Sequence, residues 1–232
     1  MSLRSLLWQS PPVKVVRYLA NVMVKSPYRK WNQGASRAKM DRLGLVKLLN
    51  LRPGDAWGAD FPDNLYLYRL VREKKPKTVL EFGSGCSTVV ISQALYENAR
   101  DNSAQSGKIY SVESEKQWAD TTANNLPEHL RPFCEVIHGP MEQAKHAGND
   151  ILNYTNVPAV DVDILYLDGP WFQGDIQIAG NPLYLEDRFK PGFLMIVDGR
   201  EPNTFYLRDH LKRKYHFKKR WLYNNSVFTL VS

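Results

Sequence analysis

Three residues of this sequence, Glu81, Gly83 and Gly85, have the types and the spacing of a binding site for a nucleotide-like cofactor. Glycine lacks a Cβ atom, so a ligand can approach the main chain closely at a turn that contains it. When a helix follows such a turn, its free N–H groups and its dipole face the ligand. The spacing therefore predicts ligand binding at residues 81–88.

The same residues indicate which cofactor the turn prefers. A dinucleotide fingerprint requires Gly-x-Gly-x-x-Gly, and Thr88 stands where the third glycine would be. The carboxylate of Glu81 would repel a pyrophosphate, whereas it suits a cationic ligand that carries an amino group and a sulfonium. The pattern thus favours a sulfonium cofactor over NAD.

A buried strand and a helix must hold this turn in place. Residues 78–82 have the apolar run of a parallel strand covered on both faces, and residues 89–95 continue with a helical apolar stripe. A second strand at residues 108–112 ends at Glu113, where nucleotide-binding α/β sheets place a carboxylate that receives two ribose hydroxyls. We expect the polar residues 98–107 between them to form an extended loop.

From Glu81 to Thr88 the chain resembles the class I S-adenosylmethionine-dependent methyltransferases. Their first motif is an acid, any residue, and Gly-x-Gly-x-Gly; Ser87 replaces the third glycine here and can cap the helix with Thr88. Residues 138–142, His-Gly-Pro-Met-Glu, resemble the adenine-contacting turn of that family, although Met141 is equally compatible with core packing. The resemblance implies that S-adenosylmethionine is the cofactor and is bound by Glu81, Gly83, Ser84, Gly85, Ser87, Thr88, Glu113, Gly139 and Met141.

Two further acids end later strands and are the candidate catalytic residues. Asp168 follows the strand at 162–167 and Asp198 follows the strand at 193–197, so both should lie where ligands bind in open α/β sheets. This pairing resembles small-molecule O-methyltransferases and implies a general base or substrate-orienting role, with Asp168 preferred. The candidate substrate residues are Trp171, Phe172 and Arg200.

A metal site is not assigned from these acids. The metal-dependent branch of the family has Asn directly after the second acid, where this chain has Gly199. An oxygen-only site needs about six ligands, and two carboxylates do not supply them. Magnesium stays an open alternative.

The sequence thus predicts an S-adenosylmethionine-dependent methyltransferase that acts on a hydroxyl of a small molecule or sugar. One alternative is an NAD(P)-dependent oxidoreductase, although the glycine pattern is incomplete for it. An aminopropyl transferase on the same fold is another. A noncatalytic basic module that binds nucleic acid is the third, and its affinity would fall steeply with salt.

Composition fits one soluble, cytoplasmic catalytic domain of 232 residues with 43% hydrophobic content. Two cysteines indicate a reducing compartment, and the N-terminal segment is too short and too charged for a secretory signal or a membrane span.

The charge is uneven: residues 1–77 carry 16 Lys and Arg against 5 acids, while the remainder has a net charge of −4. A helix is expected at residues 13–25. Its uses, in order of preference, are packing on the domain or on a second subunit, contact with an anionic membrane surface or acidic substrate, and nucleic-acid binding.

The pattern of strands and helices predicts an α/β fold: a Rossmann-like, doubly wound, mostly parallel sheet with a C-terminal antiparallel hairpin and an N-terminal helical extension. The expected division is residues 1–75 for the basic helical extension or lid and residues 76–232 for the cofactor-binding domain. Helices are expected in the gaps between the strands. The hairpin is expected at residues 216–223 and 226–231, around Asn224 and Asn225.

Overall fold

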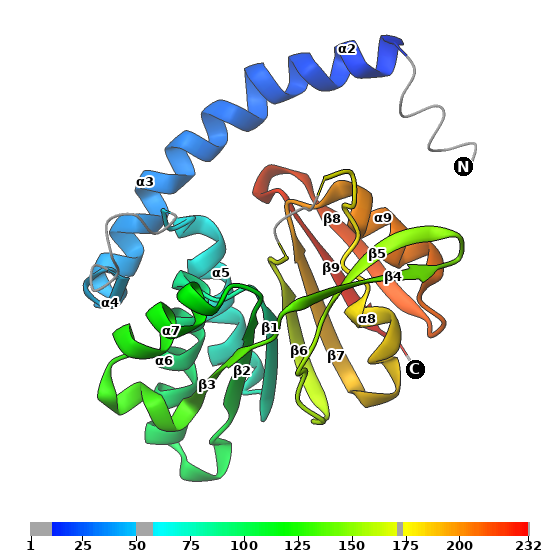
Figure 1. Cartoon of the computed structure of the whole chain (residues 1–232). Coiled ribbons are helices and arrows are strands. Elements are labelled where there is room, and N and C mark those ends of the chain that lie inside the picture. Colours follow the sequence, from blue (N-terminus) through cyan, green and yellow to red (C-terminus); the bar gives the residue numbers. More distant parts are fainter. Residues whose placement is uncertain (1–10, 50–57, 171–173, 232) are drawn as a thin grey trace.

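The protein is built around one seven-stranded sheet (Figure 1). A computed structural model describes residues 11–49, 58–170 and 174–231 of the chain. The strands, in spatial order, are β3 (Cys134–His138), β2 (Lys108–Glu113), β1 (Thr78–Phe82), β6 (Val162–Leu167), β7 (Phe189–Asp198), β9 (Asn225–Leu230) and β8 (Tyr215–Arg220). The first five are parallel to one another, and β9 is antiparallel to β7 and β8. The predicted doubly wound sheet with a C-terminal antiparallel hairpin is confirmed.

Helices and a small second sheet cover both faces. The α-helices that follow the N-terminal helix are α4 (Leu45–Leu49), α5 (Phe61–Lys74), α6 (Cys86–Asp101), α7 (Lys116–Asn125), α8 (Asn181–Tyr184) and α9 (Glu201–His210). Short 3-10 turns are η2 (Ser103–Gln105), η3 (Glu128–Phe133), η4 (Glu186–Arg188) and η5 (Trp221–Tyr223). The second sheet consists of β4 (Met141–His146) and β5 (Asn149–Tyr154).

The side chains of each parallel strand alternate between two hydrophobic clusters. Val79 of β1 packs with α4, α5 and α6, whereas Leu80 and Phe82 pack with β5, α8 and α9 on the opposite face. Figure 1 shows these two groups of helices on opposite sides of the sheet. Parallel β1, β2, β3, β6 and β7 all end at one edge, which we call the carboxyl edge and which carries the predicted site residues.

The connection after β3 differs from the expectation that helices fill the gaps. Residues 141–154 form the antiparallel pair β4 and β5. The turn between them contains Ala147 and Gly148, both with positive φ, which is the backbone geometry of a tight hairpin. The expectation was wrong because neither strand shows the strict alternation of polar and apolar side chains that marks a strand in a sequence.

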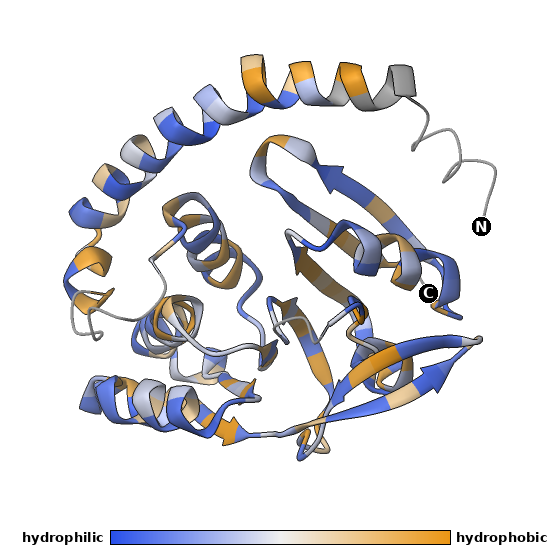
Figure 2. Ribbon diagram, turned by 45° about the horizontal axis from the view of Figure 1, so that its top comes forward, coloured by the Kyte–Doolittle hydropathy of each residue, from blue (hydrophilic) through white to orange (hydrophobic). Residues whose placement is uncertain are grey.

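The N-terminal helix is longer than the expected 13–25. Helix α2 (Pro11–Ala20) continues through a π-helical segment, η1 (Asn21–Lys25), into α3 (Ser26–Arg42). This helix arches over the rest of the molecule, and Figure 2 shows apolar positions on its α2 part. Later residues of the expected extension contribute to the core, because α4 and α5 pack in the same cluster as β1 and α6. The domain boundary near residue 75 stays a prediction.

Within the described ranges, no helix has both the length and the apolar character needed to cross a bilayer.

Candidate active site

The glycine turn joins β1 to α6 at the carboxyl edge, where the sequence predicts it. Gly83 has a φ of +95°, and its N–H donates to the Val112 carbonyl of β2 at 2.9 Å. A Cβ atom at Gly83 would lie 3.0 Å from the main-chain nitrogen of Gly169, which follows β6. Glycine is therefore needed here both for the backbone conformation and for the contact between the ends of β1 and β6.

Glu81 lies beneath the turn, and its predicted contact with the cofactor stays a prediction. Its side chain is fully buried on the face of β1 that carries Val79, below α6. Its Oε2 accepts hydrogen bonds from Thr88 Oγ1 at 2.5 Å and Ser111 Oγ at 2.6 Å. The period-two alternation of β1 already places Glu81 on this inner face.

Thr88 connects this buried acid to the glycine turn. Besides donating to Glu81, its Oγ1 accepts the Gly85 N–H at 2.8 Å. Burial raises the pKa of Glu81 to about 7, while the hydroxyl hydrogen bonds oppose the rise. The group thus supports the turn from below. Ser87 and Thr88 both lie buried in the first turn of α6. The N-cap residue is Gly85, and Thr88 caps the helix by accepting its N–H, whereas capping by Ser87 stays a prediction.

Glu113 and Ser84 bring the second predicted acid onto the turn. The Ser84 N–H donates to Glu113 Oε2 at 2.8 Å, and the Ser84 hydroxyl lies 3.0 Å from Thr122 Oγ1 of α7. Glu113 Oε1 accepts the Glu115 N–H at 3.1 Å, so the carboxylate is oriented from both sides. The glycine turn, the end of β2 and helix α7 are therefore joined by hydrogen bonds at the carboxyl edge.

The turn after β3 lies beside Glu113. The Gly139 N–H donates to the Glu113 carbonyl at 2.8 Å, and a Cβ atom at Gly139 would lie 2.3 Å from the Thr155 carbonyl oxygen. Met141 is half-buried and begins β4, where it pairs with Tyr154 of β5. The turn is thus placed next to the predicted ribose-binding acid, while adenine contact by Met141 stays a prediction.

Asp168 and Asp198 lie together where β6 and β7 end, as their positions in the sequence predict. A hydrogen bond links the two carboxyl groups. Asp168 keeps exposed surface, yet loss of hydration by the surrounding atoms raises its pKa, with Arg200 opposing the rise. Burial, and next the charge of Asp168, raise the pKa of Asp198 well above its usual range. Two adjacent carboxyls in such a place share a proton, and the pair can accept or donate one.

Arg200 contacts the catalytic candidates rather than standing apart from them. Its Nη2 donates to the main-chain oxygen of Asp168 at 2.7 Å, and burial lowers the pKa of its guanidinium. Its predicted pairing with an acceptor stays a prediction. The other substrate candidates, Trp171 and Phe172, lie outside the described residues.

Sequence reasoning missed Tyr154, which comes from the unexpected strand β5. Its side chain is only 3% exposed, stacks on Phe82 with ring centroids 5.1 Å apart, and has no hydrogen-bond partner for its hydroxyl among the described residues. A Cβ atom at Gly169 would meet that hydroxyl, so glycine makes room for it. No local motif marks such a residue, because its position depends on the hairpin.

Two acids at the start of α5 were also missed. Asp60 caps the helix and pairs with Arg29 of α3 at 2.6 Å, while Asp63 is buried and accepts the Asn225 side-chain N–H at 2.8 Å. Burial, followed by the charge of Asp60, raises the pKa of Asp63 to about 7. The charges of both acids also raise the pKa of Asp198, so they belong to the electrostatics of the same site. Their sequence signal, Asp-Phe-Pro-Asp, indicates only a helix start.

These residues fit S-adenosylmethionine by their chemistry. The N-terminus of α6 can face a carboxylate, Glu113 can accept ribose hydroxyls, and the Asp168–Asp198 pair supplies negative charge near a sulfonium. The buried Tyr154 hydroxyl offers one more unused polar group. Among the described residues, no group of three or more His, Cys, Asp or Glu side chains is arranged to hold a metal ion.

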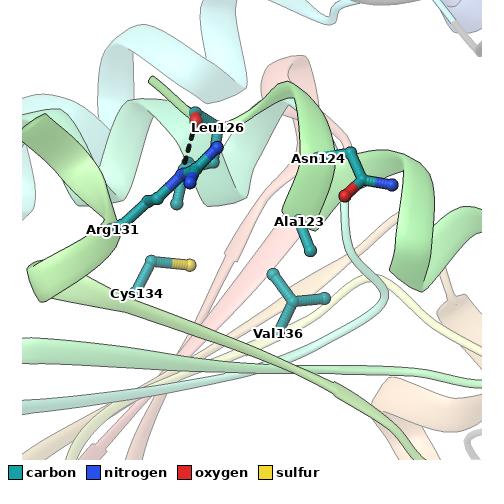
Figure 3. A pocket seen from close by; sticks show the side chains of 6 residues that line it. All are labelled: Ala123, Asn124, Leu126, Arg131, Cys134 and Val136. Carbon is teal, nitrogen blue, oxygen red and sulfur yellow. Dashed lines mark hydrogen bonds between the residues drawn. The ribbon is translucent and has the colours of Figure 1, made fainter. Parts of the chain in front are cut away.

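A cavity of about 260 Å³ lies elsewhere, between the end of α7 and β3 (Figure 3). Arg131 Nε donates to the Leu126 carbonyl at 3.5 Å on its rim. Burial raises the pKa of the Cys134 thiol that lines the cavity to about 12, so this thiol is protonated at neutral pH and is a poor nucleophile.

Solved structures share this fold across most of the chain. TomG, an O-methyltransferase from Streptomyces achromogenes involved in tomaymycin synthesis and solved with SAM, is 16% identical, with a TM-score of 0.51 over 88% of this chain and 98% of that chain. The SAH-bound Podospora anserina methyltransferase PaMTH1 is 13% identical, with a TM-score of 0.53 over 81% and 88%. A Geobacter sulfurreducens methyltransferase is 17% identical, with a TM-score of 0.50 over 84% and 89%.

No protein-family model matches the sequence, and no curated protein matches it either. The similarity is therefore one of fold. The resemblance inferred from the glycine turn is confirmed at that level: the chain has the Rossmann-like fold of the class I S-adenosylmethionine-dependent methyltransferases.

Proposed function

We propose that this protein is an S-adenosylmethionine-dependent methyltransferase whose acceptor is a hydroxyl of a small molecule or sugar. The observation that carries the proposal is the assembly at the carboxyl edge. The glycine turn is hydrogen-bonded to Glu113 through Ser84, and the Asp168–Asp198 pair follows the adjacent strands. Two of the proteins with this fold, TomG and PaMTH1, were solved with SAM and SAH, which supports the choice of cofactor.

Each part of the site has a task in this proposal. Glu113 and the N–H groups at the start of α6 hold the cofactor, which supplies a methyl group on a positively charged sulfur. With the cofactor bound, its methyl group would pass to the acceptor oxygen as the carbon–sulfur bond breaks, and Asp168 would accept the hydroxyl proton. Asp198 shares that proton with Asp168. Alignment of donor and acceptor supplies much of the rate.

The pKa of the pair sets a pH dependence. Because burial raises the pKa of both carboxyls, the base becomes ionised at a higher pH than an ordinary Asp. Activity should therefore increase with pH through a range above the usual Asp titration. The charge of Arg200 opposes this rise at Asp168.

Transfer of a labelled methyl group tests the catalytic assignment. Wild-type protein and Asp168→Asn are incubated with methyl-labelled S-adenosylmethionine and a panel of sugars, phenols, aliphatic alcohols and amines. Loss of a general base typically costs about 10²- to 10⁴-fold in kcat, while the cofactor affinity should change little. The matched control is Asp187→Asn, which alters an exposed Asp of η4.

Equal kcat for wild type and Asp168→Asn would remove Asp168 from the mechanism. Label that appears only on nitrogen acceptors would overturn the choice of a hydroxyl acceptor. Labelled product with a hydroxyl acceptor, lost in Asp168→Asn and kept in Asp187→Asn, supports the assignment.

A further inference from the structure

Helix α2 and the π-helical segment after it present an apolar face to solvent. Val15, Leu19 and Met23 follow one another at intervals of four residues, and Val16 and Val22 lie beside them on the same side of the helix. The exposed fractions are 57% for Val15, 48% for Leu19 and 72% for Met23. Figure 2 shows this apolar run at the end of the arching helix. A contiguous exposed face of this kind marks an interaction surface.

The charge of the same segment is entirely of one sign. Residues 1–40 contain eight Lys and Arg and no Asp or Glu, and the first acid of the chain is Asp41. The positive charge of this segment is a property of its sequence, which includes Lys14 and Arg17, while Lys25 contacts Asn224 of the domain. A helix with an apolar face and a basic face lies flat in a membrane interface, with the apolar side chains among the acyl chains and the cations at the headgroups.

This combination of apolar exposure and positive charge favours an anionic lipid surface over other binding partners of the helix. A second copy would bring two strongly basic segments together, at an electrostatic cost. Nucleic acid would satisfy the cations, but it draws affinity from phosphate contacts and would leave the valine, leucine and methionine side chains in water. An anionic bilayer is complementary both to the apolar face and to the positive charge of the segment.

Contacts at the base of the helix fix it to the carboxyl edge. Lys25 Nζ donates to Asn224 Oδ1 at 2.8 Å, and the Tyr28 hydroxyl donates to the Tyr223 hydroxyl at 3.0 Å. Arg29 pairs with Asp60, one of the acids that act on Asp198. A surface that binds α2 is therefore connected to the end of the sheet that carries the candidate active site.

We propose that α2 and η1 bind the surface of an anionic lipid bilayer through the face formed by Val15, Val16, Leu19, Val22 and Met23. Binding requires neither the cofactor nor a methyl acceptor, so it stands apart from the proposed enzymatic function. The helix lies on the membrane and does not cross it.

Vesicle sedimentation with the full-length chain tests this proposal. Sucrose-loaded vesicles of phosphatidylcholine alone are compared with vesicles that also contain phosphatidylglycerol, at low and high salt. We expect binding to the anionic vesicles that weakens as salt rises, and much weaker binding to the neutral vesicles. The double variant Leu19→Gln/Met23→Gln should bind about tenfold more weakly or worse, because two apolar side chains no longer enter the bilayer.

The matched control is Leu43→Gln, which makes the same change at a leucine that is 44% exposed beyond the end of α3. It should bind as the wild type does. Circular dichroism establishes that the variants keep their helix content, and sedimentation velocity without lipid measures self-association.

Three results would overturn the proposal. The first is equal binding to neutral and anionic vesicles, or no binding to either. The second is unchanged binding by the double variant. The third is a wild-type dimer in the absence of lipid that Leu19→Gln/Met23→Gln converts to a monomer, because the face would then be an interface between two copies.

Discussion

At the scale of single residues, substitution of Tyr154 tests whether its buried hydroxyl serves the fold or binds a ligand. The hydroxyl is buried without a partner among the described residues, which costs stability unless a ligand uses it. We therefore expect Tyr154→Phe to leave the thermal midpoint unchanged or to raise it, while S-adenosylmethionine binds several-fold more weakly. Thermal unfolding and calorimetric titration measure the two effects. A variant that unfolds earlier and binds normally would make the hydroxyl purely structural.

The residues that carry the candidate site were largely accessible from the sequence, because most of them end strands. Glu113, Asp168 and Asp198 were assigned from the apolar runs before them, and parallel strands bring such ends to one edge. The alternation of β1 places Glu81 on the inner face of the strand, and its contact with the cofactor stays a prediction. Tyr154 was out of reach because it depends on pairing between distant segments.

At the scale of secondary-structure elements, two glycines predict opposite responses to the same substitution. A Cβ atom at Gly139 would lie 2.3 Å from a main-chain oxygen and 2.5 Å from the Val112 side chain. Gly139→Ala should therefore displace the turn between β3 and β4 and lower the free energy of unfolding by about 1–3 kcal/mol. Gly34 lies within α3, and a Cβ atom there would meet no other part of the chain within 4 Å. Gly34→Ala should therefore raise the free energy of unfolding by about 0.5–1 kcal/mol.

Chemical denaturation of the two variants measures both signs. Stability changes of the same sign would contradict this account of the turn. Gly139→Ala should also weaken cofactor binding, because the Gly139 N–H holds the Glu113 carbonyl.

Most elements followed from local pattern, and the exceptions have a common cause. The strands β1, β2 and β6 and the helix α6 have strong apolar runs, and their positions agree with the expectations. The strands β4 and β5 show only weak alternation of polar and apolar residues. They lie outside the main sheet, where burial of both faces would require a continuous apolar run. The short α8 replaces the full helix expected between β6 and β7, because four helical residues leave almost no periodicity to detect.

At the scale of the whole molecule, the buried acids make stability depend on pH. The pKa of Asp63 is about 7 in the fold against 3.8 for the ordinary group. A raised pKa means that the stabilising contribution is complete below about pH 3.8 and is lost as pH rises through 7. Asp63→Asn removes the ionisation and can keep the Asn225 hydrogen bond. Relative to wild type, the variant should gain stability between pH 5 and pH 8, by at most about 3 kcal/mol.

Urea unfolding at the two pH values measures this gain. Asp187→Asn, at an exposed position, is the control and should show none. A wild-type stability that stays level from pH 5 to pH 8 would mean that Asp63 is ionised in the fold throughout.

Calorimetric titration of the purified protein tests the central claim most directly, namely that the turn and Glu113 form a binding site for a sulfonium nucleoside. S-adenosylmethionine, its demethylated product and NAD are titrated into wild type, Glu113→Gln and the control Glu135→Gln, which changes an exposed Glu of β3. We predict that the first two ligands bind to wild type and to Glu135→Gln, that Glu113→Gln weakens both about tenfold or more, and that NAD does not compete. Comparable binding of NAD, or equal affinity in all three proteins, would contradict the account.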